Sequence, residues 1–187
     1  MQYMLFVLLA CEAEVLTQMS LKIMSKSNTR NWTRCILTKD ITLMLNGEYG
    51  FGDGYGGEPL PFFRHFYAGG IGSVRGFKSG SLGPHDDPPN HKDALGGNKR
   101  LVANAEFLMP IPGIGLDKSF RFGGFADAGY VWATSQKMRL SDLRYSIGIS
   151  VAWSSPFGPL KFSIAQPLNK KSGDQIERFQ FQMGTSF

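Results

Sequence analysis

Long stretches of the sequence alternate apolar side chains with polar or small ones at every second residue. The clearest runs from Asp142 to Ser154, where Leu143, Ile147 and Val151 share one phase. A period of two places the apolar side chains on one face of a β-strand. We predict an all-β chain with six antiparallel strands. They are Asp40–Phe51, Arg100–Pro110, Ser119–Trp132, Asp142–Ser154, Leu160–Gln166 and Ile176–Phe187.

The length of these strands favours a membrane protein. Strands of soluble proteins usually have about 5–6 residues, whereas a tilted transmembrane strand needs roughly 9–11. Aromatic residues also stand near several strand ends, as in the interfacial girdles of outer-membrane barrels; they are Tyr49, Phe51, Tyr130, Trp132, Tyr145 and Trp153. The strands therefore predict a segment of an antiparallel transmembrane β-barrel. A soluble β-sandwich remains the alternative.

The connection from Asp53 to Lys99 is long for a compact domain, and such long connections usually have a function. It contains a glycine-rich run, Phe66–Phe77, which we call the latch loop. Its glycines allow positive φ angles and a close approach to other parts of the chain. Apolar contacts of Val74 and Phe77 can hold the tip, with Arg75 between them. The composition predicts a loop that folds back against another part of the chain.

The motif Val74-Arg75-Gly76-Phe77 resembles the loop motif of the BamA family of outer-membrane barrel assembly proteins. The resemblance extends over about residues 40–187, and the last strand ends like those of bacterial outer-membrane barrels. Residues Phe179, Phe181, Met183 and Phe187 share one phase in that strand. Further similar segments are Gly52–Gly57, Leu82–Pro84, Ala94–Asn98, Ser155–Leu160 and Ala165–Pro167.

The resemblance implies that the latch loop lies in the barrel lumen and that Arg75 meets acidic side chains on the inner wall. The strand phases nominate those partners independently, because Glu106 and Asp127 fall on the polar phase. A guanidinium presents a fork of donors that matches a carboxylate. We therefore predict a latch of Val74, Arg75, Gly76 and Phe77 on Glu106 and Asp127. The alternative is that Arg75 is a solvated loop residue.

The function implied by the resemblance is insertion of new β-barrel proteins into the bacterial outer membrane. The expected partners are outer-membrane lipid, nascent β-barrel proteins and, in the full-length family, assembly-complex lipoproteins. The last strand would form one side of a lateral gate. No enzyme activity and no cofactor are expected. The alternative is a protein-translocating pore of the related two-partner secretion family, which has a similar arginine motif.

Residues 1–38 differ from the rest, because they are rich in methionine and show no period of two. We predict a non-family segment, helical or disordered, before a barrel portion at 39–187. Six strands are also fewer than the roughly 8 that such barrels need. We therefore expect this chain alone to be an inactive fragment.

Other chemistries are disfavoured. The net charge of +5 is scattered, which disfavours nucleic-acid binding. A hydrolase triad is disfavoured because its candidate residues, Ser73, His65 and Asp87, share one loop without a nucleophile elbow. Metal ligation is disfavoured because Pro88-Pro89 marks an exposed loop tip around His85, Asp86, Asp87 and His91. The run Gly52–Gly57 matches a dinucleotide fingerprint without the helix that it requires. No catalytic or metal-binding residues are predicted.

Overall fold

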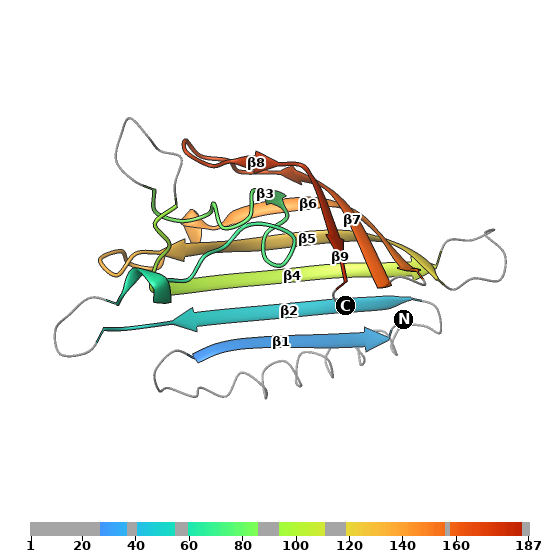
Figure 1. Cartoon of the computed structure of the whole chain (residues 1–187), viewed down its shortest axis with the longest axis horizontal. Coiled ribbons are helices and arrows are strands. Elements are labelled where there is room, and N and C mark those ends of the chain that lie inside the picture. The colour runs from blue at the N-terminus through green and yellow to red at the C-terminus, as the bar shows by residue number, and fades with distance from the viewer. Residues whose placement is uncertain are drawn as a thin grey trace.

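The computed structural model describes residues 41–54, 60–85, 94–110, 119–155 and 158–184, and the backbone of 27–36. One antiparallel sheet contains seven strands in chain order (Figure 1). They are β1 (Ser27–Ile36), β2 (Thr42–Phe51), β4 (Lys99–Pro110), β5 (Phe120–Trp132), β6 (Arg144–Ser155), β7 (Gly158–Pro167) and β9 (Phe179–Met183). The predicted all-β, antiparallel fold class is confirmed, with one strand more than the six expected.

The additional strand is β1, which lies in the segment that we predicted to be helical or disordered. Its ten residues pair with β2 over their whole length, from Ser27 opposite Phe51 to Ile36 opposite Thr42. The prediction is therefore wrong for residues 27–36. Backbone hydrogen bonds to the exposed edge of β2 do not require an alternating sequence, so the periodicity gave no signal. Residues 1–26 lie outside the described part of the chain.

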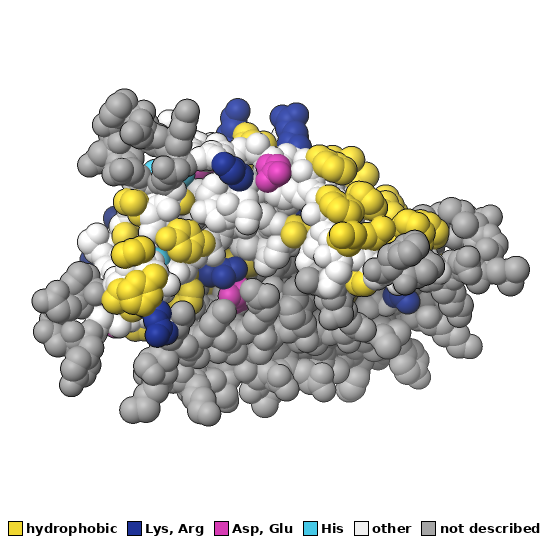
Figure 2. Space-filling model, viewed as in Figure 1, with side chains coloured by type: hydrophobic (Ala, Val, Ile, Leu, Met, Phe, Trp, Pro, Cys, Tyr) yellow, Lys and Arg dark blue, Asp and Glu magenta, His cyan; other side chains and the backbone are white. Residues whose placement is uncertain are grey.

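The two faces of the sheet have opposite character. The side chains of Asn104, Glu106 and Asp127 are buried on the concave face, while those of Ile147 and Ile149 are exposed on the convex face. Hydrophobic side chains gather over the end of the sheet where β7 and β9 lie (Figure 2). They are Phe162, Ile164, Phe179, Phe181 and Met183. This is the apolar-out, polar-in arrangement of a transmembrane barrel wall.

The long connection between β2 and β4 lies against the concave face (Figure 1). It contains a short 3-10 helix, η1 (Phe62–Arg64), and the two-residue strand β3 (Gly76–Phe77). The buried apolar core joins this connection to the inner wall. Its members are Phe66, Ala68, Val74, Phe77 and Leu82 from the connection, with Val102 and Val131 from β4 and β5. The core of the structure is therefore inside the curved sheet.

The predicted last strand is divided into two. Its first part, β8 (Ile176–Glu177), pairs with β3 in a separate two-stranded sheet, whereas β9 pairs with β7. The Ala165 amide donates to the Arg178 carbonyl at 2.8 Å, and two residues further along β7 stands Pro167. Because proline has no N–H, the β7 ladder cannot continue in the same way. The chain therefore joins the edge of the sheet only from Arg178 onward, and the residues before it pair elsewhere.

The described residues include one other short 3-10 helix, η2 (Leu140–Asp142). Within this part of the chain, no helix is long and apolar enough to cross a membrane.

We predict that Ile149→Lys destabilises the barrel wall. Ile149 lies near the middle of β6 and is 47% exposed on the convex face, where lysine at the bilayer midplane costs about 2–4 kcal/mol. The measurement is urea unfolding, in lipid vesicles, of a complete barrel that carries this segment. Ile149→Leu is the control and should be near neutral. Equal stability of the lysine and leucine variants would contradict the assignment of this face to lipid.

Candidate functional site

Arg75 is buried on the concave face, where both predicted carboxylates hold it. Its Nε and Nη2 atoms donate to Oδ2 and Oδ1 of Asp127 at 2.6 and 2.8 Å, and its Nη1 donates to Oε2 of Glu106 at 3.1 Å. The backbone amide of Arg75 also donates to Asp127 Oδ2 at 3.1 Å. Arg75 is only 3% exposed. The structure thus brings together the three charged residues that the strand phases nominated, and Arg75 is not solvated.

The strand register explains how one guanidinium reaches both carboxylates. Glu106 of β4 stands opposite Phe125 of β5, and Asp127 lies two residues further along the same face of β5. The Arg75 Cζ atom lies over the Phe125 ring, 3.4 Å from its centroid. A cation over an aromatic face is attracted by the ring quadrupole. The register therefore brings two carboxylates and an aromatic ring to neighbouring inward positions.

Two further residues complete the site, and neither was predicted from the sequence. Lys161 Nζ of β7 donates to Glu106 Oε2 at 2.7 Å, and Ser150 Oγ of β6 donates to Glu106 Oε1 at 2.6 Å. Both side chains must reach past β5. The buried inward position opposite Ser150 on β5 is Gly123, which carries no side chain. The one available signal was that Lys161 lies on the inward phase of its strand.

The charges of the site balance, because two cations, Arg75 and Lys161, face two carboxylates. Burial by itself lowers the pKa of the Arg75 guanidinium. Hydrogen bonds to Asp127 and the negative charges of both carboxylates outweigh burial, so this pKa is raised above its ordinary value. Arg75 therefore stays charged. Removal of one partner would leave a buried charge uncompensated, which is strongly destabilising.

The backbone of the latch loop is fixed as well. Asn104 Nδ2 donates to the Ser73 carbonyl at 2.5 Å, and Asn46 Nδ2 donates to Asn104 Oδ1 at 2.8 Å. Gly76 has a φ of +88°, and a Cβ atom there would meet the Ala165 side chain at 3.0 Å. Glycine is needed at this position on both counts. Val74 and Phe77 are fully buried on either side of Arg75 and Gly76.

The C-terminal strand residues Phe179, Phe181 and Met183 are exposed on the convex face, whereas the Gln180 side chain between them is buried. Phe187 lies outside the described residues.

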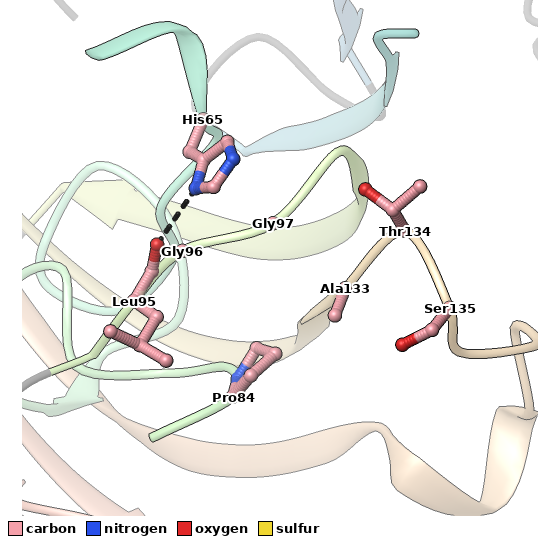
Figure 3. Close-up of a pocket in the computed structure, with 8 residues that line it drawn as sticks. All are labelled: His65, Pro84, Leu95, Gly96, Gly97, Ala133, Thr134 and Ser135. Carbon is pink, nitrogen blue, oxygen red and sulfur yellow. Dashed lines mark hydrogen bonds between the residues drawn. The ribbon is translucent and has the colours of Figure 1, made fainter. Parts of the chain in front are cut away.

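His65 lies at a shallow pocket at the rim of the sheet, lined also by Pro84, Leu95 and Ala133 (Figure 3). Its Nδ1 atom is 2.9 Å from the Leu95 carbonyl oxygen, and its Nε2 atom is 3.1 Å from that of Leu60. Ser73, by contrast, lies in the latch loop beside Asn104. Asp86, Asp87 and His91 lie outside the described residues, among which no group of three or more potential metal ligands occurs.

The curved sheet, its apolar outer face and its charged inner face define a segment of an outer-membrane β-barrel with a loop bound to its inner wall. Residues 22–187 match the model of the Omp85 superfamily domain. The chain therefore belongs to the Omp85 superfamily, and it is an outer-membrane protein. The match begins before residue 27, so the family region extends into the segment that we placed outside it.

Individual relatives agree with this family. The outer membrane protein assembly factor BamA of Neisseria meningitidis serogroup B is 44% identical over 193 residues, which cover 89% of this chain and 24% of that protein. The factor of the same name from Nitratidesulfovibrio vulgaris is 35% identical over 68% of this chain and 16% of its own length. The crystal structure of BamA from Haemophilus ducreyi lacking POTRA domains 1–3 superposes with a TM-score of 0.70 at 32% identity, over 81% of this chain and 32% of that one.

We predict that Gly129→Ala displaces the latch loop. A Cβ atom at Gly129 would lie 2.8 Å from Val74 Cγ2 and 2.9 Å from the Leu101 carbonyl oxygen. The matched control is Gly124→Ala in the same strand, where the nearest atom is 3.9 Å away. Limited proteolysis of a complete barrel should cut the latch loop faster in the Gly129 variant only, since overpacking costs about 1–3 kcal/mol. Equal cleavage of the two variants would show that the loop does not lie on β5.

Proposed function

We propose that this segment works in an outer-membrane assembly factor that folds and inserts β-barrel proteins into the outer membrane. The support comes from relatives named outer membrane protein assembly factor at 44% and 35% identity and from the similarity to a BamA barrel structure. The chain spans about a quarter of the Neisseria relative. The segment therefore contributes to an activity that belongs to a complete barrel. That activity is not enzymatic.

The single observation that carries the proposal is the binding of Arg75 by Asp127 and Glu106. These contacts join the latch loop to β4 and β5, and Lys161 extends them to β7. The loop thereby links wall strands that are far apart in the sheet. We infer that the latch keeps the barrel wall in the curvature at which substrates are inserted.

The last strand supplies the second part of the proposed mechanism. β9 is the last strand in the order of the described sheet, where it lies next to β7. An open strand edge can template an incoming strand by β-augmentation. We infer that this edge forms one side of a lateral gate that receives nascent β-barrel proteins from within the membrane. Assembly-complex lipoproteins would act on the complete barrel.

We predict that Arg75→Glu strongly lowers insertion activity. A third carboxylate beside Asp127 and Glu106 would be repelled from the wall, and a close like-charge contact costs several kcal/mol. The measurement is folding of a substrate barrel in liposomes that contain a complete barrel carrying this segment, and activity should fall at least about tenfold. Arg64→Glu is the matched control, because Arg64 is exposed in the same connection.

Charge reversal provides the rescue. Adding Asp127→Arg to Arg75→Glu restores the main pair and leaves the Glu106–Lys161 contact intact. Part of the activity should return. Undiminished activity of Arg75→Glu, or a loss of the same size in Arg64→Glu, would show that the latch is not required.

A further inference from the structure

A second buried ion pair lies near the latch loop, between Arg144 at the start of β6 and Asp174 in the connection from β7 to β8. Arg144 Nε donates to Asp174 Oδ2 at 2.6 Å, and Nη2 donates to Oδ1 at 3.3 Å. The two side chains are only 4% and 1% exposed. Arg144 Nη1 also donates to the Asp142 carbonyl at 2.6 Å. Arg144 is therefore both buried and bound by three hydrogen bonds, unlike a side chain in a solvent-exposed turn.

Asp174 fixes the shape of its own turn. Its Oδ2 atom also accepts the Lys171 amide at 2.6 Å, and its amide donates to the Lys171 carbonyl at 3.2 Å. Gly173, with a φ of +94°, lies against His85, since a Cβ atom there would be 3.6 Å from His85 Nδ1. The ion pair thus holds a turn that contacts both the inner wall and the long connection.

The residues directly after Asp174 bind the latch loop. The Lys78 amide donates to the Gln175 carbonyl at 2.9 Å, and β8 pairs with β3, which places Glu177 opposite Gly76 and Ile176 opposite Phe77. Gln180 Nε2 then donates to the Phe77 carbonyl at 2.8 Å. The residue next to Asp174 therefore already binds the backbone at the end of the latch loop.

The sheet edge cannot offer β8 an equivalent place. After the bond from the Ala165 amide to the Arg178 carbonyl, the next donor on β7 would be Pro167, which has none. In that ladder the Ile176 carbonyl would face Pro167 and would have no donor. β8 instead pairs with β3 through its other edge.

We propose that Arg144 and Asp174 are positioning residues that form a second anchor of the latch loop and couple it to the last strand. The pair holds the β7–β8 turn on the wall, and the turn holds β8 on β3. Release of the loop from the wall and release of β8 from the loop are then one event. The proposal rests on the proposed role of the latch loop, and adds the element through which the loop acts on the last strand.

The test measures burial of the latch loop in a complete barrel that carries this segment and has no other cysteines. Ser73, which is 4% exposed, is replaced by cysteine as a reporter, and its rate of maleimide labelling is followed. Asp174→Asn should raise this rate at least about tenfold, because loss of one partner leaves Arg144 buried and uncompensated. Arg144→Asp combined with Asp174→Arg should return the rate toward that of the parent.

The matched control is Lys171→Ala. Lys171 Nζ and Asp142 Oδ1 form an ion pair at 3.3 Å between the β7–β8 connection and the residues just before β6, but Lys171 is half-exposed there. The labelling rate should therefore change by no more than about twofold. A parent-like rate in Asp174→Asn, together with fast labelling in Arg75→Gln, would overturn the second anchor and leave the proposed latch standing. Slow labelling in Arg75→Gln would overturn both.

A measurement on the unsubstituted barrel does not depend on the folding of any variant. If loop and strand open in one event, the backbone amides of residues 76–78 and 175–177 exchange with deuterium at rates that agree within about threefold. Exchange at least about tenfold faster in one segment than in the other would overturn the coupling.

Discussion

The described structure depends on a single guanidinium that is buried against the inner face of the curved β-sheet. Arg75 reaches Asp127 through two side-chain hydrogen bonds and Glu106 through a third, and Val74 and Phe77 are buried on either side. Removing a charge from water is costly unless its partners are in place. The partners of Arg75 are the acidic residues of β4 and β5 and the Phe125 ring, and the glycines of the loop let it approach them. The ion pairs thus specify where the loop lies more than they add stability.

The two carboxylates are not equivalent. Glu106 also accepts from Lys161 and Ser150 on neighbouring strands, so it keeps partners if Arg75 withdraws. Asp127 takes three of its bonds from Arg75. Asp127 thus depends on the loop for its hydrogen bonds. Glu106 connects the loop to β6 and β7 through Ser150 and Lys161.

Strand phase and a motif predicted much of this arrangement, because a period of two decides which side chains face inward. That reasoning was sufficient to pair Arg75 with Glu106 and Asp127. Phe125, Ser150 and Lys161 required the register between strands, which no single strand encodes. β1 was missed because pairing with the β2 edge needs only backbone groups. The division of β8 from β9 follows from Pro167, whose effect appears only when its partner on the opposite strand is known.

The central claim is that the bond between Arg75 and Asp127 holds the loop on the wall, and a double-mutant cycle tests it most directly. Unfolding free energies are measured for a complete barrel with Arg75→Gln, Asp127→Asn and both changes. The account predicts a coupling energy of at least about 1.5 kcal/mol, as for close charge pairs in buried sites. Effects that add within about 0.5 kcal/mol would show that the two residues do not act together, and would contradict the account.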